Sequence, residues 1–215
     1  MDWSEALCAR ARAAIPNGRF EAGDMRSMPY EDNEFGSIVS LGAIEHTIEG
    51  PYDSLREYAR VLRPDGIAII TVPYWSTVWQ ITRVISLPRY LRRMNFIRKL
   101  FGKKALEHGS LKDLKTRTVK GWATDYLFND GKYEFYQYQF TKRQIREVFI
   151  SCGWDIVEEF AEHGDEGIFH NFGFLVGKYD KIKGVQFNYF GKLLRRIIDV
   201  KLMGLMLCYV LRPPA

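Results

Sequence analysis

Two short apolar runs with a helical segment between them restrict the fold of this chain more than any other feature. The runs SIVSL, residues 37–41, and IAIITVPY, residues 67–74, are rich in β-branched residues and have the length of buried strands. Between them, residues 51–63 repeat apolar side chains at helical spacing, and Pro64-Asp65-Gly66 ends the repeat. A strand, a helix and a second strand in this order predict a parallel pair in an α/β domain.

The α/β pattern continues on both sides of this unit, with two long interruptions. Thr141 and Gln144 have the spacing of a capping box and Gly153 is a stop signal, so a helix is expected between them. The other predicted elements are helices at 4–15 and 190–200 and strands at 19–22, 154–160 and 204–211. We interpret residues 75–139, made of basic and aromatic helical pieces, and residues 161–203 as inserted segments.

Composition excludes several classes of protein. With 215 residues, of which 47% are hydrophobic, the chain can bury one substantial core and fits a single domain. The three cysteines have no paired spacing, which argues against a disulfide framework and favours a reducing cytoplasm. The most apolar stretch, residues 202–211, is about half of the ~20 residues that a membrane-spanning helix needs. Residues 163–170 contain metal-ligand residue types without the spacing of a metal site, so a polar loop and no metal are expected.

Positive charge is concentrated in one segment. Between Arg83 and Lys120 there are twelve lysines and arginines against Glu107 and Asp113, a net charge of +10 in a chain whose total is +5. Such a segment indicates an anionic partner, for example a phosphorylated substrate, a lipid headgroup surface or RNA. A solvated helical face is the other interpretation, and nucleic acid is not expected because no RNA-binding motif is present.

A series of short motifs then points to a family. The motifs are Gly23-Asp24, Met28-Pro29-Tyr30, Asp32-Asn33-Glu34-Phe35, Glu45-His46 and Arg60-Val61-Leu62-Arg63-Pro64-Asp65-Gly66. In this order and spacing they resemble the class I S-adenosylmethionine-dependent methyltransferases of the type 11 group. The first residues, Asp2-Trp3-Ser4-Glu5-Ala6-Leu7, resemble the segment after the second strand in that family. Gly36, where an aspartate is usual, and Asp65, where a glycine is common, depart from the pattern.

The resemblance implies a fold and a domain organisation. It implies an α/β, Rossmann-like methyltransferase fold with three αβα layers and a mostly parallel sheet, lacking the first strand and the glycine-rich loop. Residues 1–215 would form a single incomplete methyltransferase domain. Residues 75–139 would be an inserted acceptor lid, and residues 161–203 a helical insertion before the last strand.

The resemblance also implies which residues hold the cofactor, S-adenosyl-L-methionine. Asp2 would accept hydrogen bonds from the ribose hydroxyls and Asp24 one from the adenine amine. Met25 would lie along the adenine ring, while Leu41 and Gly42 would border the methionine moiety. From the residues alone, a helix-capping role for Asp2 and a turn-forming role for Asp24 are the alternatives.

Candidate residues for the acceptor follow the predicted strands. His46 is a candidate for taking the proton of the acceptor, although it also belongs to the Glu-His pair of the family. Tyr74, at the carboxyl end of the strand at 67–74, is a candidate contact to the acceptor or a packing residue. Trp75 and Trp79 begin the proposed lid.

The predicted function is methyl transfer from S-adenosylmethionine to an oxygen atom of a small or a lipid- or sugar-linked acceptor. A basic lid would suit an anionic acceptor. The alternative is a catalytically impaired fragment that does not hold the cofactor, and we expect the 215-residue chain to bind the cofactor weakly or not at all. We expect a cytoplasmic protein, with peripheral membrane association as a variant. The sequence does not predict an oligomeric state.

Overall fold

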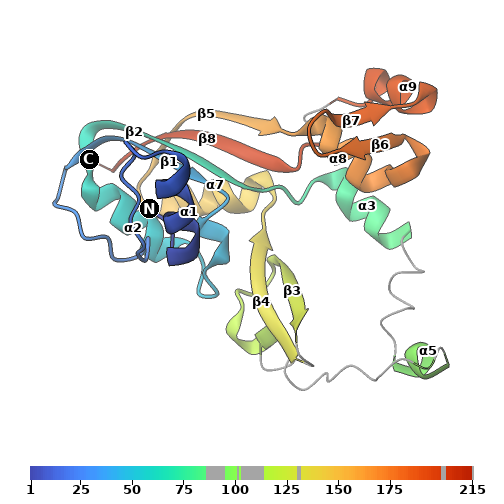
Figure 1. Ribbon diagram of the computed structural model, residues 1–215, viewed down its shortest axis with the longest axis horizontal. Coiled ribbons are helices and arrows are strands. Elements are labelled where there is room, and N and C mark those ends of the chain that lie inside the picture. The colour runs from blue at the N-terminus through green and yellow to red at the C-terminus, as the bar shows by residue number, and fades with distance from the viewer. Residues whose placement is uncertain (86–94, 101, 103–113, 130–131, 200–201, 215) are drawn as a thin grey trace.

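A four-stranded sheet forms the centre of the protein in the computed structural model, which describes residues 1–85, 95–100, 102, 114–129, 132–199 and 202–214 (Figure 1). In sheet order its strands are β1 (Phe35–Leu41), β2 (Leu62–Pro73), β8 (Met206–Arg212) and β5 (Asp155–Glu162). β1 and β2 are parallel, as predicted, whereas β8 is antiparallel to both β2 and β5. β5 therefore runs in the same direction as β1 and β2, so three of the four described strands point the same way, and the expected fold class is confirmed with β8 as the one reversed strand of the described sheet.

Two helices cover one face of this sheet. α2 (Tyr52–Val61) is the crossover between β1 and β2, and α7 (Lys142–Ser151) begins at the predicted capping box of Thr141. Alternate residues of β2 from Ala68 to Val72 and of β8 from Leu207 to Leu211 pack toward these helices, as the period of a strand requires. The largest fully buried side chains of this core are Ile44, Leu55, Leu62, Ile70, Tyr138, Phe140, Ile145, Phe149, Leu207 and Tyr209.

The opposite face of β1 and β2 is more open. Val39 and Leu41 of β1 are 62% and 67% exposed, and their neighbours Ile67 and Ile69 on β2 are also exposed. α1 (Glu5–Ala14), capped by Ser4 as predicted, buries only Cys8. Most of the hydrophobic stabilisation of the described sheet therefore comes from the face that carries α2 and α7.

The segment 75–139 contains a hairpin that was not predicted. It is made of β3 (Ala123–Asn129) and β4 (Lys132–Gln139), which pair antiparallel and project from the sheet in Figure 1. The helices α3 (Thr77–Ile85) and α5 (Asn95–Leu100) belong to the same segment. Most of the basic stretch lies outside the described residues, in 86–94 and 103–113.

Beyond β5, residues 164–199 of the segment 161–203 form a distal lobe at the end of the sheet away from both termini (Figure 1). Its elements are α8 (Gly164–Phe172), η2 (Gly173–Leu175), β6 (Gly177–Asp180), β7 (Gly184–Phe187) and α9 (Tyr189–Ile197). The expected loop at 163–170 is instead helix α8, and the insertion is only partly helical because β6 and β7 form a hairpin. The predicted helix near residue 190 is α9. Within the described ranges, no helix combines the length and apolarity needed to cross a bilayer.

The lobe is fastened to the sheet by a close backbone contact that yields a prediction. A Cβ atom on Gly167 of α8 would overlap the carbonyl oxygen of Met203. Replacing glycine by alanine in a helix usually stabilises it by roughly 0.5–1 kcal/mol. Here we expect Gly167→Ala to lower the free energy of unfolding by about 1–3 kcal/mol, because the helix must move away from Met203. Urea unfolding measures this difference.

The control for this measurement is Arg10→Ala on the exposed side of α1, which should change stability by less than about 0.5 kcal/mol. A Gly167→Ala protein as stable as the wild type would contradict the close packing of α8 on residue 203.

Candidate functional site

The carboxyl ends of β1 and β2 lie side by side. Leu41 pairs with Thr71, and the amide of Gly42 donates to the Thr71 carbonyl oxygen at 3.1 Å and to its Oγ1 at 3.0 Å. Gly42 has φ +61°, in the region that glycine adopts most readily, so the chain turns sharply out of the sheet here. The turn leads into η1 (Ile44–His46).

Asp2 and Asp24 lie at the ends of neighbouring extended segments. Asp2 and Ala22 form a parallel bridge, in which the Asp2 amide donates to Glu21 O at 3.1 Å and the Gly23 amide donates to Asp2 O at 2.9 Å. The predicted strand at 19–22 is reduced to this bridge. The backbone thus brings together the two aspartates that the sequence singled out, and their roles toward a cofactor stay a prediction.

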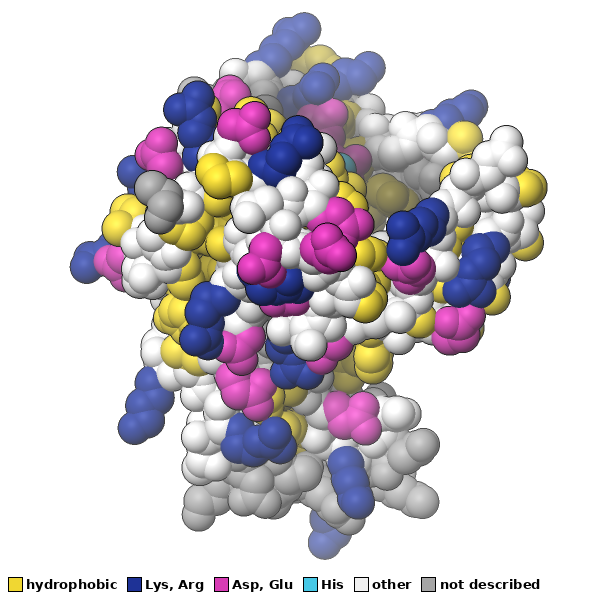
Figure 2. Space-filling view, turned by 90° about the vertical axis from the view of Figure 1, so that its left-hand side faces the viewer, with side chains coloured by type: hydrophobic (Ala, Val, Ile, Leu, Met, Phe, Trp, Pro, Cys, Tyr) yellow, Lys and Arg dark blue, Asp and Glu magenta, His cyan; other side chains and the backbone are white. Residues whose placement is uncertain are grey.

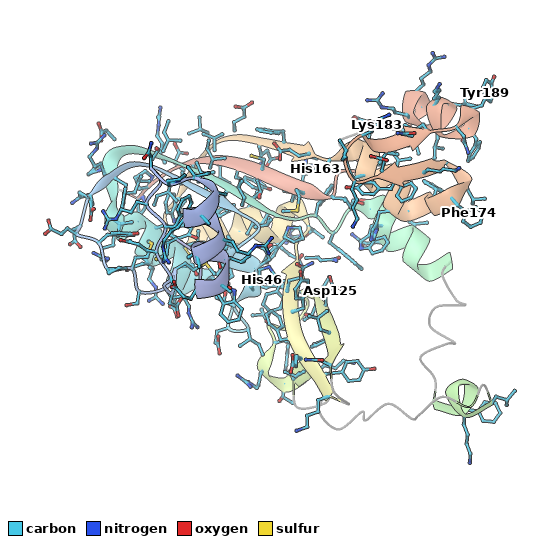
Figure 3. The ribbon with its side chains drawn as sticks, in the orientation of Figure 1. His46, Asp125, His163, Phe174, Lys183 and Tyr189 are labelled. Carbon is cyan, nitrogen blue, oxygen red and sulfur yellow. The ribbon has the colours of Figure 1, made fainter. Side chains whose placement is uncertain are left out.

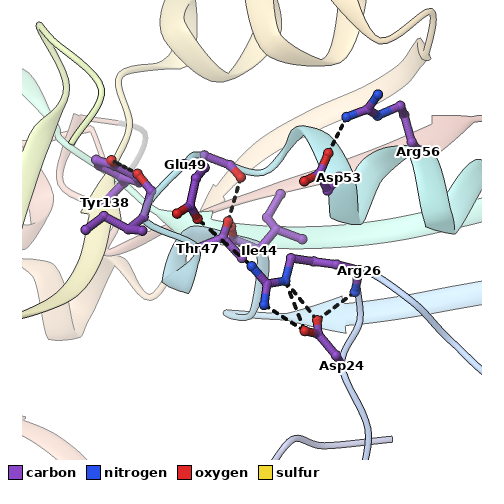
Figure 4. Close-up of polar contacts among 10 residues, drawn as sticks. Asp24, Arg26, Ile44, Thr47, Glu49, Asp53, Arg56 and Tyr138 are labelled. Carbon is purple, nitrogen blue, oxygen red and sulfur yellow. Dashed lines mark hydrogen bonds and ion pairs between the residues drawn. The ribbon is translucent and has the colours of Figure 1, made fainter. Parts of the chain in front are cut away.

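Both aspartates also make local hydrogen bonds. Asp2 Oδ1 accepts the Ser4 amide at 2.8 Å, next to the start of α1. Asp24 accepts the backbone amide of Arg26 at 2.9 Å and its guanidinium, with Nη2 to Oδ2 at 2.7 Å (Figure 4). These bonds from Arg26 hold the pKa of Asp24 below its ordinary value. Asp2 therefore makes the contact expected near a helix start, and Asp24 makes those expected in a turn.

Met25 is turned toward the core. Its Sδ atom accepts a hydrogen bond from the Tyr58 hydroxyl at 3.5 Å, and the same hydroxyl lies 3.0 Å from Ser40 Oγ on β1. The side chain of Met25 thereby anchors the turn after Asp24 to α2.

Leu41 is well exposed at the strand end, where a ligand has access to it.

His46 is held by the hairpin. Its Nδ1 lies 2.7 Å from the carbonyl oxygen of Tyr136, and the two rings meet edge to face. A carbonyl oxygen can only accept, so Nδ1 carries the hydrogen and the neutral ring presents Nε2 as a proton acceptor. The imidazole is partly exposed, so Nε2 is available to a ligand.

Glu45, next to His46, carries a buried carboxyl group. Its side chain is 2% exposed, and Oε2 has no hydrogen-bond partner among the described residues. Burial raises the pKa of this carboxyl to about 8. Oε1 lies 3.8 Å from Nε2 of His46, too far for a direct hydrogen bond, and it faces Gly42. The only sequence signal for this residue is its place in the Glu-His pair.

The acceptor candidates gather after β2. Tyr74 donates its amide to Leu205 O at 2.8 Å, and Trp75 donates its amide to Phe140 O at 2.8 Å. Trp79 Nε1 donates to Gln139 Oε1 at 3.1 Å, and its ring lies 6.1 Å from that of Trp75. The aromatic group is therefore fixed at the end of β2, on the same edge of the sheet as Gly42.

Arg60 explains why the motifs at 28–35 and 60–66 occur together. Its guanidinium donates to Met28 O at 3.2 Å, Tyr30 O at 2.8 Å and Asp32 Oδ1 at 2.7 Å, and it pairs with Glu57. The loop that follows Met25 is thus fastened to α2. In the described part of the chain, no three His, Cys, Asp or Glu side chains gather as a metal site would require.

Comparison with known proteins finds a family model that matches the first third of the chain. The family model described as methyltransferase domain matches residues 1–70. The resemblance to the class I S-adenosylmethionine-dependent methyltransferases is confirmed. The part matched by this methyltransferase model contains all five cofactor candidates, from Asp2 to Gly42, and ends before Tyr74.

Two curated relatives, both methyltransferases by name, match part of this chain. Demethylmenaquinone methyltransferase of Chlorobaculum parvum is 36% identical over 72 residues, which are 34% of this chain and 30% of that protein. The chloroplastic 2-methyl-6-phytyl-1,4-hydroquinone methyltransferase 1 of Oryza sativa is 34% identical over 71 residues, 33% of this chain and 21% of that protein. The matched region thus spans less than a third of either relative.

A crystal structure of a methyltransferase from Methanosarcina mazei described as S-adenosylmethionine-dependent superposes with a TM-score of 0.54 at 12% identity. The match covers 99% of this chain and 80% of that chain. At this level of identity the likeness confirms the Rossmann-like methyltransferase fold and nothing finer.

The burial of Glu45 predicts that the stability of the protein depends on pH. Its folded-state pKa of about 8 lies above the ordinary value of 4.5, so between these values the folded protein binds more protons than the unfolded chain. Stability should therefore fall as pH rises through this window, by at most about 1.4 kcal/mol per pH unit from this group. In Glu45→Gln the side chain cannot ionise, and we expect this part of the slope to vanish. Urea midpoints across the window measure it.

Glu134→Gln, on the exposed hairpin, is the matched control for Glu45→Gln. If both variants keep the slope of the wild type, the burial of Glu45 does not govern the pH dependence.

Proposed function

We propose that this chain transfers a methyl group from S-adenosylmethionine to a small or a lipid- or sugar-linked acceptor, with oxygen as the methylated atom. The observation that carries the proposal is the geometry at the strand ends. Asp2 and Asp24 lie on neighbouring extended segments, and Gly42 turns sharply at the end of β1, all within the residues that match the methyltransferase family.

The chemistry of these residues fits the adenosine part of the cofactor. A carboxylate offers about four lone-pair sites, and Arg26 makes four contacts with those of Asp24, from its amide, Nε and Nη2, so the guanidinium would have to turn away before an adenine amine donates to Asp24. On Asp2, one oxygen accepts the Ser4 amide and the other is available for ribose hydroxyls. Gly42 has no side chain, so its backbone lets a ligand approach closely. The bound cofactor supplies an activated methyl group, and the protein positions the acceptor.

Three features support an aromatic hydroxyl-bearing acceptor. His46 presents Nε2 as a proton acceptor, because Tyr136 holds its other ring nitrogen. Trp75 and Trp79 offer flat apolar surfaces at the same sheet edge. The two relatives are named for a demethylmenaquinone and a phytyl hydroquinone, and a ring of that kind would suit this surface.

The cofactor proposal predicts an effect of Asp24→Asn. The substitution removes a charged hydrogen-bond acceptor worth about 1.5–3 kcal/mol, so the Kd for S-adenosylmethionine should rise by roughly 10- to 150-fold. Isothermal titration calorimetry on the 215-residue chain measures it. Asp53→Asn, on the exposed surface of α2, is the control and should leave the Kd unchanged. A wild-type chain that does not bind the cofactor would favour the impaired fragment instead.

The acceptor proposal predicts an effect of His46→Gln. Loss of the proton acceptor should lower the rate of methyl transfer by about 10²–10⁴-fold, while cofactor affinity stays the same. The assay is transfer of a labelled methyl group to hydroquinone and phenol acceptors. Tyr136→Phe keeps the carbonyl that orients His46 and should retain activity. A parallel loss of affinity and activity in His46→Gln would indicate a structural role.

A further inference from the structure

The distal lobe exposes an apolar patch that no described part of the chain covers. Phe174 is 85% exposed and Tyr189 is 86% exposed, and both point outward at the far end of the lobe (Figure 3). Phe174 and Leu175 belong to η2, while Tyr189 begins α9. The two elements are held together by Asn188, whose Nδ2 donates to Leu175 O at 2.9 Å and whose amide donates to Val176 O at 2.9 Å.

α9 extends this patch along its length. Gly191, Leu194 and Ile198 pack toward the small core of the lobe, with Gly191 against the Val176 carbonyl. A second row, at the spacing of one helix face, is exposed instead: Phe190, Leu193 and Ile197, the last of them at 72%. The helix therefore has more apolar surface than the lobe can bury. We call Phe174, Leu175, Tyr189, Phe190, Leu193 and Ile197 the distal patch.

Positive charge borders the distal patch. Residues 173–199 contain six lysines and arginines against Asp180 and Asp199, a net charge of +4. Lys192 and Arg196 are one helical turn apart on α9, next to the exposed row. Arg195 pairs with Asp165 at 2.6 Å, whereas Lys192 and Arg196 form no ion pair with any described residue. At the opposite end of the molecule, Lys and Arg are interspersed with Asp and Glu (Figure 2).

We propose that the distal patch docks on an anionic lipid bilayer surface. Exposed aromatic and aliphatic side chains on one face of a helix, with lysine and arginine beside them, are the features of a helix that lies in a membrane interface. Tyr189 is suited to that depth because its ring is apolar and its hydroxyl is polar. Lys192 and Arg196 would contact lipid phosphates while Phe190, Leu193 and Ile197 enter the acyl boundary.

A second copy of this chain is the competing occupant of the patch, and the charges favour the lipid. In a symmetric dimer, a patch bordered by Lys192 and Arg196 would meet the same positive charges on its partner, which is unfavourable. An anionic surface neutralises them. The proposal concerns binding alone and does not depend on methyl transfer.

Sedimentation of the 215-residue protein with vesicles tests the proposal without any cofactor. We expect binding to phosphatidylcholine vesicles that contain phosphatidylglycerol, and weaker binding to phosphatidylcholine alone or at high salt. Tyr189→Ser with Ile197→Ser should weaken partitioning by about tenfold or more, since apolar area enters the bilayer. Lys192→Glu with Arg196→Glu should abolish the preference for phosphatidylglycerol.

Ile150→Ser is the matched control, because Ile150 is 62% exposed on α7, away from the lobe. It should bind vesicles as the wild type does, and circular dichroism checks that each variant is folded. The proposal is overturned if the wild type ignores phosphatidylglycerol or if the Tyr189/Ile197 variant binds as tightly as the wild type. It is equally overturned if the wild type does not bind vesicles and sedimentation equilibrium shows that it forms a dimer, which the Tyr189/Ile197 variant does not form.

Discussion

The parallel pairing of β1 with β2 is the constraint on which the rest of the structure depends. A parallel pair requires a crossover, and α2 supplies it while burying Leu55 and Tyr58 against the sheet. Because the two strands run the same way, they end at the same edge. Gly42 and Tyr74 therefore meet at one edge although 31 intervening residues separate them in the chain. The candidate site is a consequence of this pairing rather than of any local motif.

The loop before β1 is positioned by the same unit. Arg60 on α2 holds the carbonyl groups of Met28 and Tyr30, and Tyr58 holds Met25. The turn that begins at Asp24 is therefore held in place by contacts to the crossover helix. The motif that identifies the family is in large part the set of residues that fastens this loop, which explains why it is recognisable in sequence.

The sequence predicted those elements whose signals are local. Thr141 with Gln144 and Ser4 are caps that act within four residues, and both helices begin where these residues indicate. The hairpin β3–β4 was missed although its strands are rich in tyrosine and phenylalanine, which favour strands, because the whole segment was interpreted as helical; its support is tertiary, through Tyr138 and Phe140 in the core. α8 was missed because Gly164 and Gly167 disfavour a helix locally, and its packing on residue 203 overrides that preference. The burial of Glu45 also depends on neighbours distant in sequence.

The lobe is joined to the candidate site through two chain connections and one contact between rings. β2 leads through Tyr74 into α3, β5 leads into α8, and the Trp79 ring lies 4.5 Å from that of His170 on α8. The lobe therefore stands beside the carboxyl ends of β1 and β2, next to the aromatic group formed by Trp75 and Trp79. The distal patch lies at the far end of the same lobe (Figure 3), so the proposed lipid surface and the proposed acceptor site are joined through α3 and α8.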